Sequence, residues 1–80
     1  MTKEDAYIRL VSLLEADFQV PREKIADDTH LRTDLGLDSL ALTDLALLVQ
    51  TDFGFDSEPD SFMGLATVGA LAEFVAVNAP

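Results

Sequence analysis

The sequence predicts an all-α fold, a small four-helix bundle with three main helices, one short helix and a long first loop. Apolar residues recur at helical spacing, and no stretch of useful length alternates with a period of two. Hydrophobic residues make up 49% of the chain, which is too many for a disordered tail. A chain of 80 residues leaves no room for a second domain, so we expect residues 1–80 to form one domain with a simple core.

The first helix is predicted from about Lys3 to Asp17. Thr2 can serve as its N-cap, and Glu4 and Asp5 suit the positive end of the helix dipole in the first turn. The helical spacing places one apolar stripe on this helix: Tyr7, Leu10, Val11, Leu14 and Phe18.

A long loop is predicted from residue 19 to residue 37, because Pro, Gly and paired Asp residues interrupt the helical pattern. A loop of this length in a small domain is uncommon unless it is functional. Its spaced apolar residues are expected to hold it across the helices: Val20, Ile25, Leu31 and Leu35.

The second helix is predicted to start near Asp38 and to end near Phe53, with Gly54 as its C-cap. A helical wheel at about 100° per residue gives this helix a clear apolar face. The centre of that face consists of Leu42, Leu45, Val49 and Phe53, flanked by Ala41, Ala46 and Leu48.

The opposite face of this helix is polar but includes two leucines. Leu40 and Leu47 lie beside Ser39 and Asp44, on the side that should meet water. A single exposed leucine needs no explanation, whereas two of them a helical stride apart indicate a docking strip. The alternative is that the long loop buries them.

The rest of the chain predicts two more helical segments. The stretch EPDSFMG can hold one short helical turn, since Pro59 suits a first helical position. Thr67 then caps a last helix that runs to about Val77. The inner face of that helix is predicted to contain Val68, Leu71, Phe74 and Val75.

The charge distribution excludes several classes of function. Fifteen acidic and five basic residues give a net charge of −10, and residues 33–80 contain eight acids and no base. Nucleic acids and anionic membranes are therefore poor partners, whereas proteins with basic docking patches suit this chain. The absence of cysteine and the single His30 argue against a metal site. No apolar run approaches the roughly 20 residues that span a bilayer, so we expect a cytoplasmic protein. Nothing in the sequence suggests an obligate oligomer, so we expect a monomer.

Three Asp–Ser pairs occur, at residues 38–39, 56–57 and 60–61. Only Ser39 falls in the first turn of a long helix, where free backbone N–H groups and the helix dipole favour an anion such as a phosphate. Asp38 is the expected N-cap, and Gly36 allows a tight turn just before it. On spacing alone, ordinary helix capping is the better explanation of such a pair.

The stretch DLGLDSLAL resembles the acyl carrier proteins, and the order of helices resembles that family over essentially the whole chain. The resemblance implies that Ser39 carries covalent 4′-phosphopantetheine and that Asp38 positions this serine for a phosphopantetheinyl transferase. It also implies that Leu40, Asp44 and Leu47 contact partner enzymes, such as an acyltransferase or a ketosynthase. Such a chain would carry thioesters and would itself be no enzyme.

Within this resemblance, the second helix is poor in acids. Only Asp44 and Asp52 follow the serine, so apolar contact should count for more in docking. The sequence DSLAL resembles carriers of aromatic polyketide systems, which favours a dedicated biosynthetic carrier over the general fatty-acid one. A peptidyl, aminoacyl or D-alanyl carrier and an unmodified helical adaptor that docks through Leu40 and Leu47 are the alternatives.

Two further expectations concern chemistry inside the domain. A growing acyl chain could fold back among apolar residues of three helices, although a solid core is equally consistent with the sequence. That pocket would be lined by Leu45, Val49, Met63, Leu65 and Leu71. A serine hydrolase built on Ser39 and His30 is disfavoured, because the chain has no G-x-S-x-G elbow.

Overall fold

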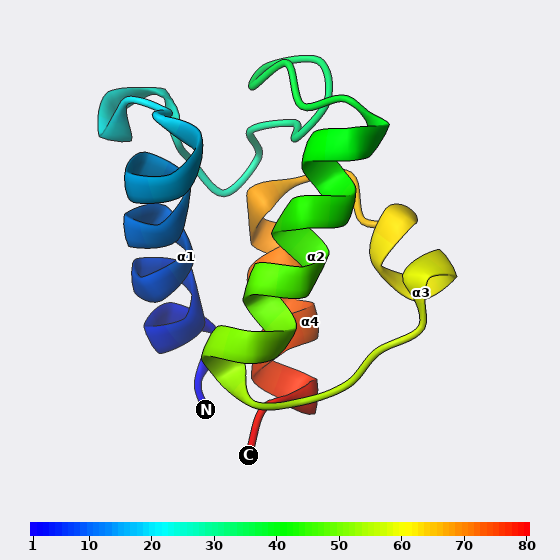
Figure 1. The fold of residues 1–80 in the computed structure, drawn as a ribbon. Helices are drawn as coiled ribbons and strands as arrows, with labels where there is room; N and C mark the ends of the chain where they lie inside the picture. The colour runs from blue at the N-terminus through cyan, green and yellow to red at the C-terminus, as the bar shows by residue number, and fades with distance from the viewer.

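The computed structural model describes residues 1–80, apart from the side chains of residues 59 and 60. The elements along the chain are α1 (Lys3–Phe18), the 3₁₀ turn η1 (Arg22–Lys24), α2 (Ser39–Phe53), α3 (Pro59–Met63) and α4 (Val68–Asn78). Figure 1 shows α1, α2 and α4 packed together, with the short α3 beside α2 and away from α1. Both termini lie at one end of the bundle and the loop between α1 and α2 lies at the other. The predicted all-α architecture is confirmed.

The three long helices start in the same way, at the caps that the sequence predicts. The side chains of Thr2, Asp38 and Thr67 each accept a hydrogen bond from the backbone N–H three residues later, at 3.1, 2.9 and 3.0 Å. Each bond satisfies one of the first-turn donors that a helix leaves without an internal acceptor. Short polar side chains before apolar repeats therefore set where the helices begin.

The first two long helices end in left-handed residues. Gly54 follows α2 with φ 72°, and its N–H donates to the carbonyl of Gln50 at 2.9 Å. Gln19 follows α1 with φ 56°, and its N–H donates to the carbonyl of Leu14. Glycine takes this conformation freely, whereas a glutamine rarely does. The helix α1 ends at Phe18, one residue beyond the prediction. No glycine follows it in the sequence to mark that end.

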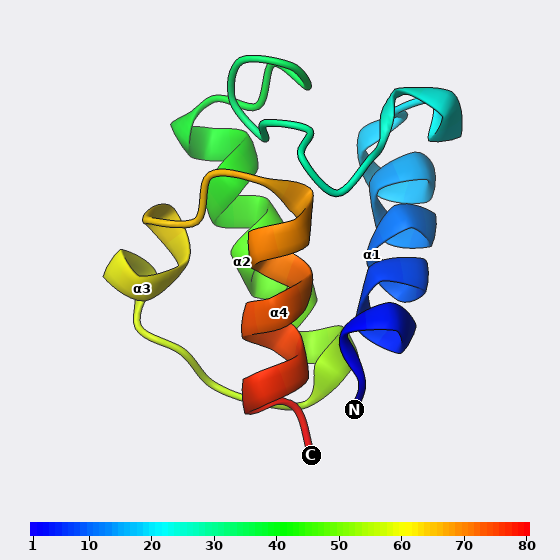
Figure 2. The same ribbon diagram turned by 180° about the vertical axis from the view of Figure 1, so that it is seen from behind.

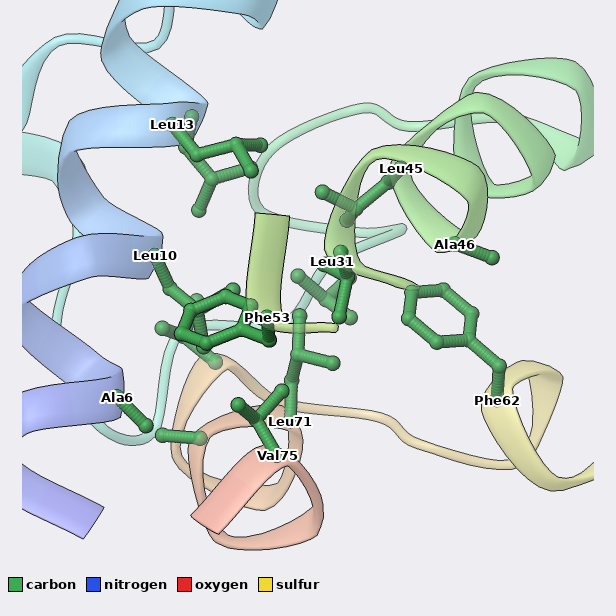
Figure 3. Packing of buried hydrophobic residues seen from close by; sticks show 14 of the residues in the cluster. Ala6, Leu10, Leu13, Leu31, Leu45, Ala46, Phe53, Phe62, Leu71 and Val75 are labelled. Atoms are coloured by element: carbon green, nitrogen blue, oxygen red, sulfur yellow. The ribbon is translucent and has the colours of Figure 1, made fainter. Parts of the chain in front are cut away.

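The core forms where the apolar faces of α1, α2 and α4 meet. All four residues predicted at the centre of the α2 face are at most 5% exposed. Figure 3 shows side chains of these helices pointing toward one another, together with Leu31 from the loop and Phe62 from α3. Further buried positions, outside the predicted stripes, are Ala6, Leu13, Gly69 and Ala72.

The long loop is anchored by its apolar residues, as the sequence predicts. Val20 and Leu31 are buried, and Ile25 and Leu35 are partly buried against the core. Figure 2 shows the loop crossing the end of the bundle that lies away from the termini. The loop thus closes that end of the core and leads directly into α2.

Backbone hydrogen bonds also join this loop to the start of α4. At the start of α4, the N–H of Val68 donates to the carbonyl of Thr29 at 3.0 Å, and the N–H of Gly69 donates to the carbonyl of Asp27 at 2.8 Å. The N–H of Leu31 donates to the carbonyl of Ala66 at 2.9 Å. The loop carbonyls therefore satisfy donors that would otherwise lack partners at the start of α4.

Candidate functional site

Ser39 is the first residue of α2, and its side chain is exposed. The preceding Gly36 has φ 71°, a left-handed conformation that permits the turn into the helix. The carbonyl of Ser39 accepts a hydrogen bond from the Thr43 hydroxyl at 2.9 Å, which holds the backbone of the first turn. The structure thus presents a serine hydroxyl to solvent on a fixed backbone.

Asp38 performs the capping function at this helix start. Its Oδ1 accepts from the N–H of Ala41 at 2.9 Å, so the Ser39 hydroxyl is not needed as a cap. The N–H groups of Ser39 and Leu40 occupy positions that have no acceptor inside the helix. They and the helix dipole provide partial positive charge next to an exposed hydroxyl, in a setting that favours an attached anion.

The exposed face of α2 contains all three residues predicted to dock partners. Leu40 is 78% exposed, Leu47 is 59% exposed, and Asp44 is exposed between them. Two large apolar side chains thus lie on one helix face, both open to solvent. We call the three exposed residues Leu40–Asp44–Leu47 the docking strip, after the role that the sequence predicts for them. The loop does not bury them, so the alternative that it covers these leucines is wrong.

Leu47 also lines two clefts that sequence reasoning did not predict. One cleft, of about 80 Å³, lies between α2 and α3 and is closed by Phe62 and Met63. The other, of about 360 Å³, lies at the end of α2 and is lined by Phe55. The docking strip therefore borders a mainly apolar hollow against α3 and a more polar hollow at the end of α2. The signal in the sequence was Phe62, because a large apolar side chain in a short helical turn indicates that the turn packs against another element.

Of the two arrangements that the sequence left open, an acyl pocket among three helices or a solid core, the structure shows the solid core. Leu45, Val49 and Leu71 are at most 1% exposed and belong to the packed core. Figure 3 shows Leu45 and Leu71 pointing into that core. Met63 and Leu65 line a separate surface cleft instead. Close packing of the interior fills the space that the predicted pocket would need.

The other two Asp–Ser pairs lie in different settings. Ser57 is partly buried, and its Oγ accepts from Nε2 of Gln50 at 3.3 Å. Ser61 is exposed but belongs to the five-residue α3, and the side chain of Asp60 lies outside the described residues. Neither pair has a first-turn serine on a long helix.

The geometry gives no support to a serine hydrolase. His30 is exposed and lines a cleft whose walls do not include Ser39. Outside the side chains of residues 59 and 60, no group of three or more His, Cys, Asp and Glu residues could hold a metal ion. None of the described helices is long and apolar enough to cross a bilayer.

Comparisons with known proteins identify the family. Residues 8–75 match the family described as phosphopantetheine attachment site. The chain is 33% identical over 78 residues to an acyl carrier protein of Coprothermobacter proteolyticus, covering 98% of this chain and 95% of that protein. It is 32% identical over 73 residues to an acyl carrier protein of Saccharopolyspora erythraea, covering 91% and 77%.

The fold agrees with these matches. A solved structure of an acyl carrier protein from Enterococcus faecalis superimposes with a TM-score of 0.81, at 22% identity, over 99% of this chain and 100% of that one. Members of this family are carriers rather than catalysts and hold a covalently attached 4′-phosphopantetheine. The exposed serine at the start of a capped helix, the helical bundle and the match over residues 8–75 agree, and the chain belongs to the acyl carrier protein family.

Proposed function

We propose that residues 1–80 form one acyl carrier domain in which Ser39 bears the 4′-phosphopantetheine arm. The arm holds acyl intermediates as thioesters, and the domain delivers them to the enzymes of a fatty-acid-like or polyketide pathway. The observation that supports this most directly is the exposed Ser39 at the first position of α2, with Asp38 already serving as the cap. That arrangement leaves the hydroxyl available for modification.

The residues around Ser39 fit a phosphodiester-linked group. Partial positive charge at the start of α2 faces the place where the phosphate would attach. The arm supplies a thiol that forms the thioester. The chain has no cysteine, so no side chain competes with that thiol for the acyl group. Asp38 fixes the backbone on which the transferase acts and positions Ser39 through the cap at Ala41.

Partner enzymes are proposed to dock on the strip Leu40–Asp44–Leu47. These partners include a phosphopantetheinyl transferase and an acyltransferase or ketosynthase with a basic and apolar patch. Beyond Ser39, α2 contains only Asp44 and Asp52 as acids, which supports a dedicated polyketide-type carrier with mainly apolar docking. We propose that the carrier acts without catalysis, as a monomer in the cytoplasm.

One alternative is supported by the same surface. Leu40 and Leu47 would be equally exposed on an unmodified helical adaptor. An aminoacyl or D-alanyl carrier would share the attachment site and differ only in the acyl group. Loss of function on removing the serine hydroxyl separates both kinds of carrier from the adaptor.

The test is intact-mass analysis after incubation with coenzyme A, magnesium and a broad-specificity phosphopantetheinyl transferase. The wild type should gain the mass of one 4′-phosphopantetheine group, and Ser39→Ala should gain none. Ser61→Ala is the matched control, because Ser61 is also exposed and also follows an aspartate, and it should gain the full mass. If the wild type gained no mass, the adaptor would be favoured. If Ser39→Ala gained mass, the arm would be attached to a residue other than Ser39.

A further inference from the structure

A surface cleft of about 200 Å³ lies between the loop before α2 and the segment that joins α3 to α4. One wall combines a cation with polar groups, and the other is mostly apolar. The lining residues are His30, Arg32, Thr33, Met63, Gly64, Leu65 and Ala66. This cleft is distinct from the two clefts along the docking strip, both of which include Leu47.

Backbone hydrogen bonds hold the two walls together. The N–H of Leu31 donates to the carbonyl of Ala66 at 2.9 Å, and His30 pairs with Thr67 in an isolated antiparallel bridge. The side chain of Leu31 is 1% exposed and anchors the loop in the core. The cleft is therefore a fixed feature of the fold, placed between two segments that are far apart in the sequence.

The loop brings this cleft close to Ser39. The N–H of Leu37 donates to the carbonyl of Leu31 at 3.1 Å, so the loop turns back on itself between these residues. Arg32 directly follows Leu31 in the sequence, and Ser39 lies two positions after Leu37. Figure 2 shows the loop and the segment between α3 and α4 lying toward the end of the bundle where α2 begins.

The charge in this cleft is unusual for the molecule. Arg32 is the last cation in the sequence, and residues 33–80 supply none. Ion pairs within 4 Å occupy two other cations, Lys3 with Asp27 and Arg22 with Glu15. Among the side chains that the structure describes, none forms an ion pair with Arg32. Arg32 therefore offers an anionic group near Ser39 a cation that no described carboxylate pairs.

We propose that this cleft binds the free carboxylate of an acyl group that ends in a carboxylate and is carried as a half-thioester. The guanidinium of Arg32 matches a carboxylate with two parallel N–H donors, and the imidazole of His30 offers a further donor. Met63 and Leu65 cover the intervening methylene groups. The volume is below the range of about 300–1,000 Å³ for drug-sized ligands, which suits a short acyl group rather than a long chain. This inference rests on the proposed role of Ser39.

The test compares two acyl groups of equal length on the intact protein. A succinyl group ends in a carboxylate where a butyryl group ends in a methyl. Each acyl group is transferred to Ser39 together with the arm, from its coenzyme A thioester. Backbone amide NMR shifts should differ between the two forms at residues 30–33 and 63–66. The difference should vanish in Arg32→Gln and persist in Lys24→Gln, which removes a loop cation that does not line the cleft.

A second measurement follows the guanidinium itself. Arg32 should react with phenylglyoxal several-fold more slowly in the succinyl form than in the butyryl form, while Arg22 in the same molecule reacts equally in both. Equal reactivity of Arg32 and equal amide shifts in the succinyl and butyryl forms would overturn the proposal. Any change that the two forms share would then be an effect of the arm itself. Persistence of the succinyl shifts in Arg32→Gln would overturn it as well. Failure of Ser39 to accept any arm would overturn this proposal together with the proposed function.

Discussion

The guanidinium of Arg9 lies 4.3 Å from the centroid of the Phe53 ring. The same group donates to the carbonyl of Asp52 at 2.9 Å. Phe53 is the last residue of α2 and its ring is buried, whereas Arg9 extends from α1. A cation from one helix therefore caps the negative end of another and covers an aromatic ring of the core. The contact fixes the far end of α2, opposite Ser39.

Arg9→Ala should lower the free energy of unfolding by about 1–2 kcal/mol. A cation–π contact contributes about 0.5–1 kcal/mol at an exposed site, and a hydrogen bond from a charged donor contributes about 1.5–3 kcal/mol before exposure reduces it. Urea unfolding followed by circular dichroism measures the change. Arg22→Ala is the control, because its ion pair with Glu15 at 3.1 Å is half-exposed on both sides. That variant should lose less than about 1 kcal/mol, and an equal loss in both variants would contradict a special role for Arg9.

The helices were predictable because local chemistry determines them. Short polar caps at Thr2, Asp38 and Thr67 precede apolar repeats, and all three caps form as predicted. The end of α1 was less predictable, because Gln19 adopts a left-handed conformation without being glycine or asparagine. Buried small residues such as Ala6 and Ala72 were missed for a related reason. Their burial depends on where neighbouring helices approach, which no periodicity in one helix reports.

Thr29→Val should destabilise the protein by about 1–3 kcal/mol. The Thr29 hydroxyl is buried, accepts from the N–H of Ala26 at 2.8 Å and donates to the carbonyl of Lys24 at 3.2 Å. Valine keeps the shape but removes both hydrogen bonds, each of which contributes about 0.5–1.5 kcal/mol. Thermal unfolding measures the loss. Thr33→Val changes an exposed threonine of the same loop and should be nearly neutral, whereas equal losses would show that the hydroxyl network is unimportant.

The candidate site shows a similar division between local and tertiary information. The exposure of Leu40 and Leu47 followed from the helical wheel, because the face of a helix depends on its own spacing. The clefts beside Leu47 did not follow, because one arises where α3 packs on α2 through Phe62 and the other where the chain turns away from the end of α2 at Phe55. The choice between an acyl pocket and a solid core was open in the sequence for the same reason. Leu45 lies on the predicted face, but the wheel could not show that other helices fill the space against it.

Leu47→Asp should slow modification by the phosphopantetheinyl transferase without unfolding the carrier. The side chain is 59% exposed, so its replacement should change stability by no more than about 0.5 kcal/mol. If the leucine anchors the docking surface, kcat/KM should fall about tenfold, equivalent to about 1.4 kcal/mol. Ile8→Asp is the matched control, because Ile8 is 56% exposed but lies on α1. If both variants were slowed to a similar degree, the fall in kcat/KM would be due to the added negative charge and not to the loss of Leu47.

The transferase reaction should depend weakly on salt. Only Asp44 and Asp52 contribute acidic charge to α2 after Ser39, so few charge pairs are available for screening. Raising the ionic strength from about 0.1 M to about 1 M shortens the Debye length from about 10 Å to about 3 Å and should change KM only modestly. Thr51→Glu adds an acid at an exposed position of α2 and should steepen the dependence. A steep dependence in the wild type would contradict mainly apolar docking.

Gly69 and Asp27 lie in direct contact where the loop meets α4. The N–H of Gly69 donates to the carbonyl of Asp27 at 2.8 Å, and a Cβ added to Gly69 would lie 2.5 Å from the carboxyl carbon of Asp27. Gly69→Ala should therefore cost about 1–3 kcal/mol, because the carboxylate must move and leave its ion pair with Lys3. Urea unfolding of this variant measures that cost directly.

The same contact predicts the sign of a double-mutant cycle. Asp27→Ala keeps the backbone carbonyl, removes the clashing carboxylate and loses an ion pair with Lys3 whose two side chains are 45% and 66% exposed, so alone it should cost less than about 1 kcal/mol. With the carboxylate absent, Gly69→Ala should become neutral or slightly stabilising, since alanine favours the helix more than glycine does. The two changes should then couple by at least about 0.5 kcal/mol in the favourable direction. Additive losses would instead show that the backbone around α4, and not the Asp27 side chain, excludes a larger residue at position 69.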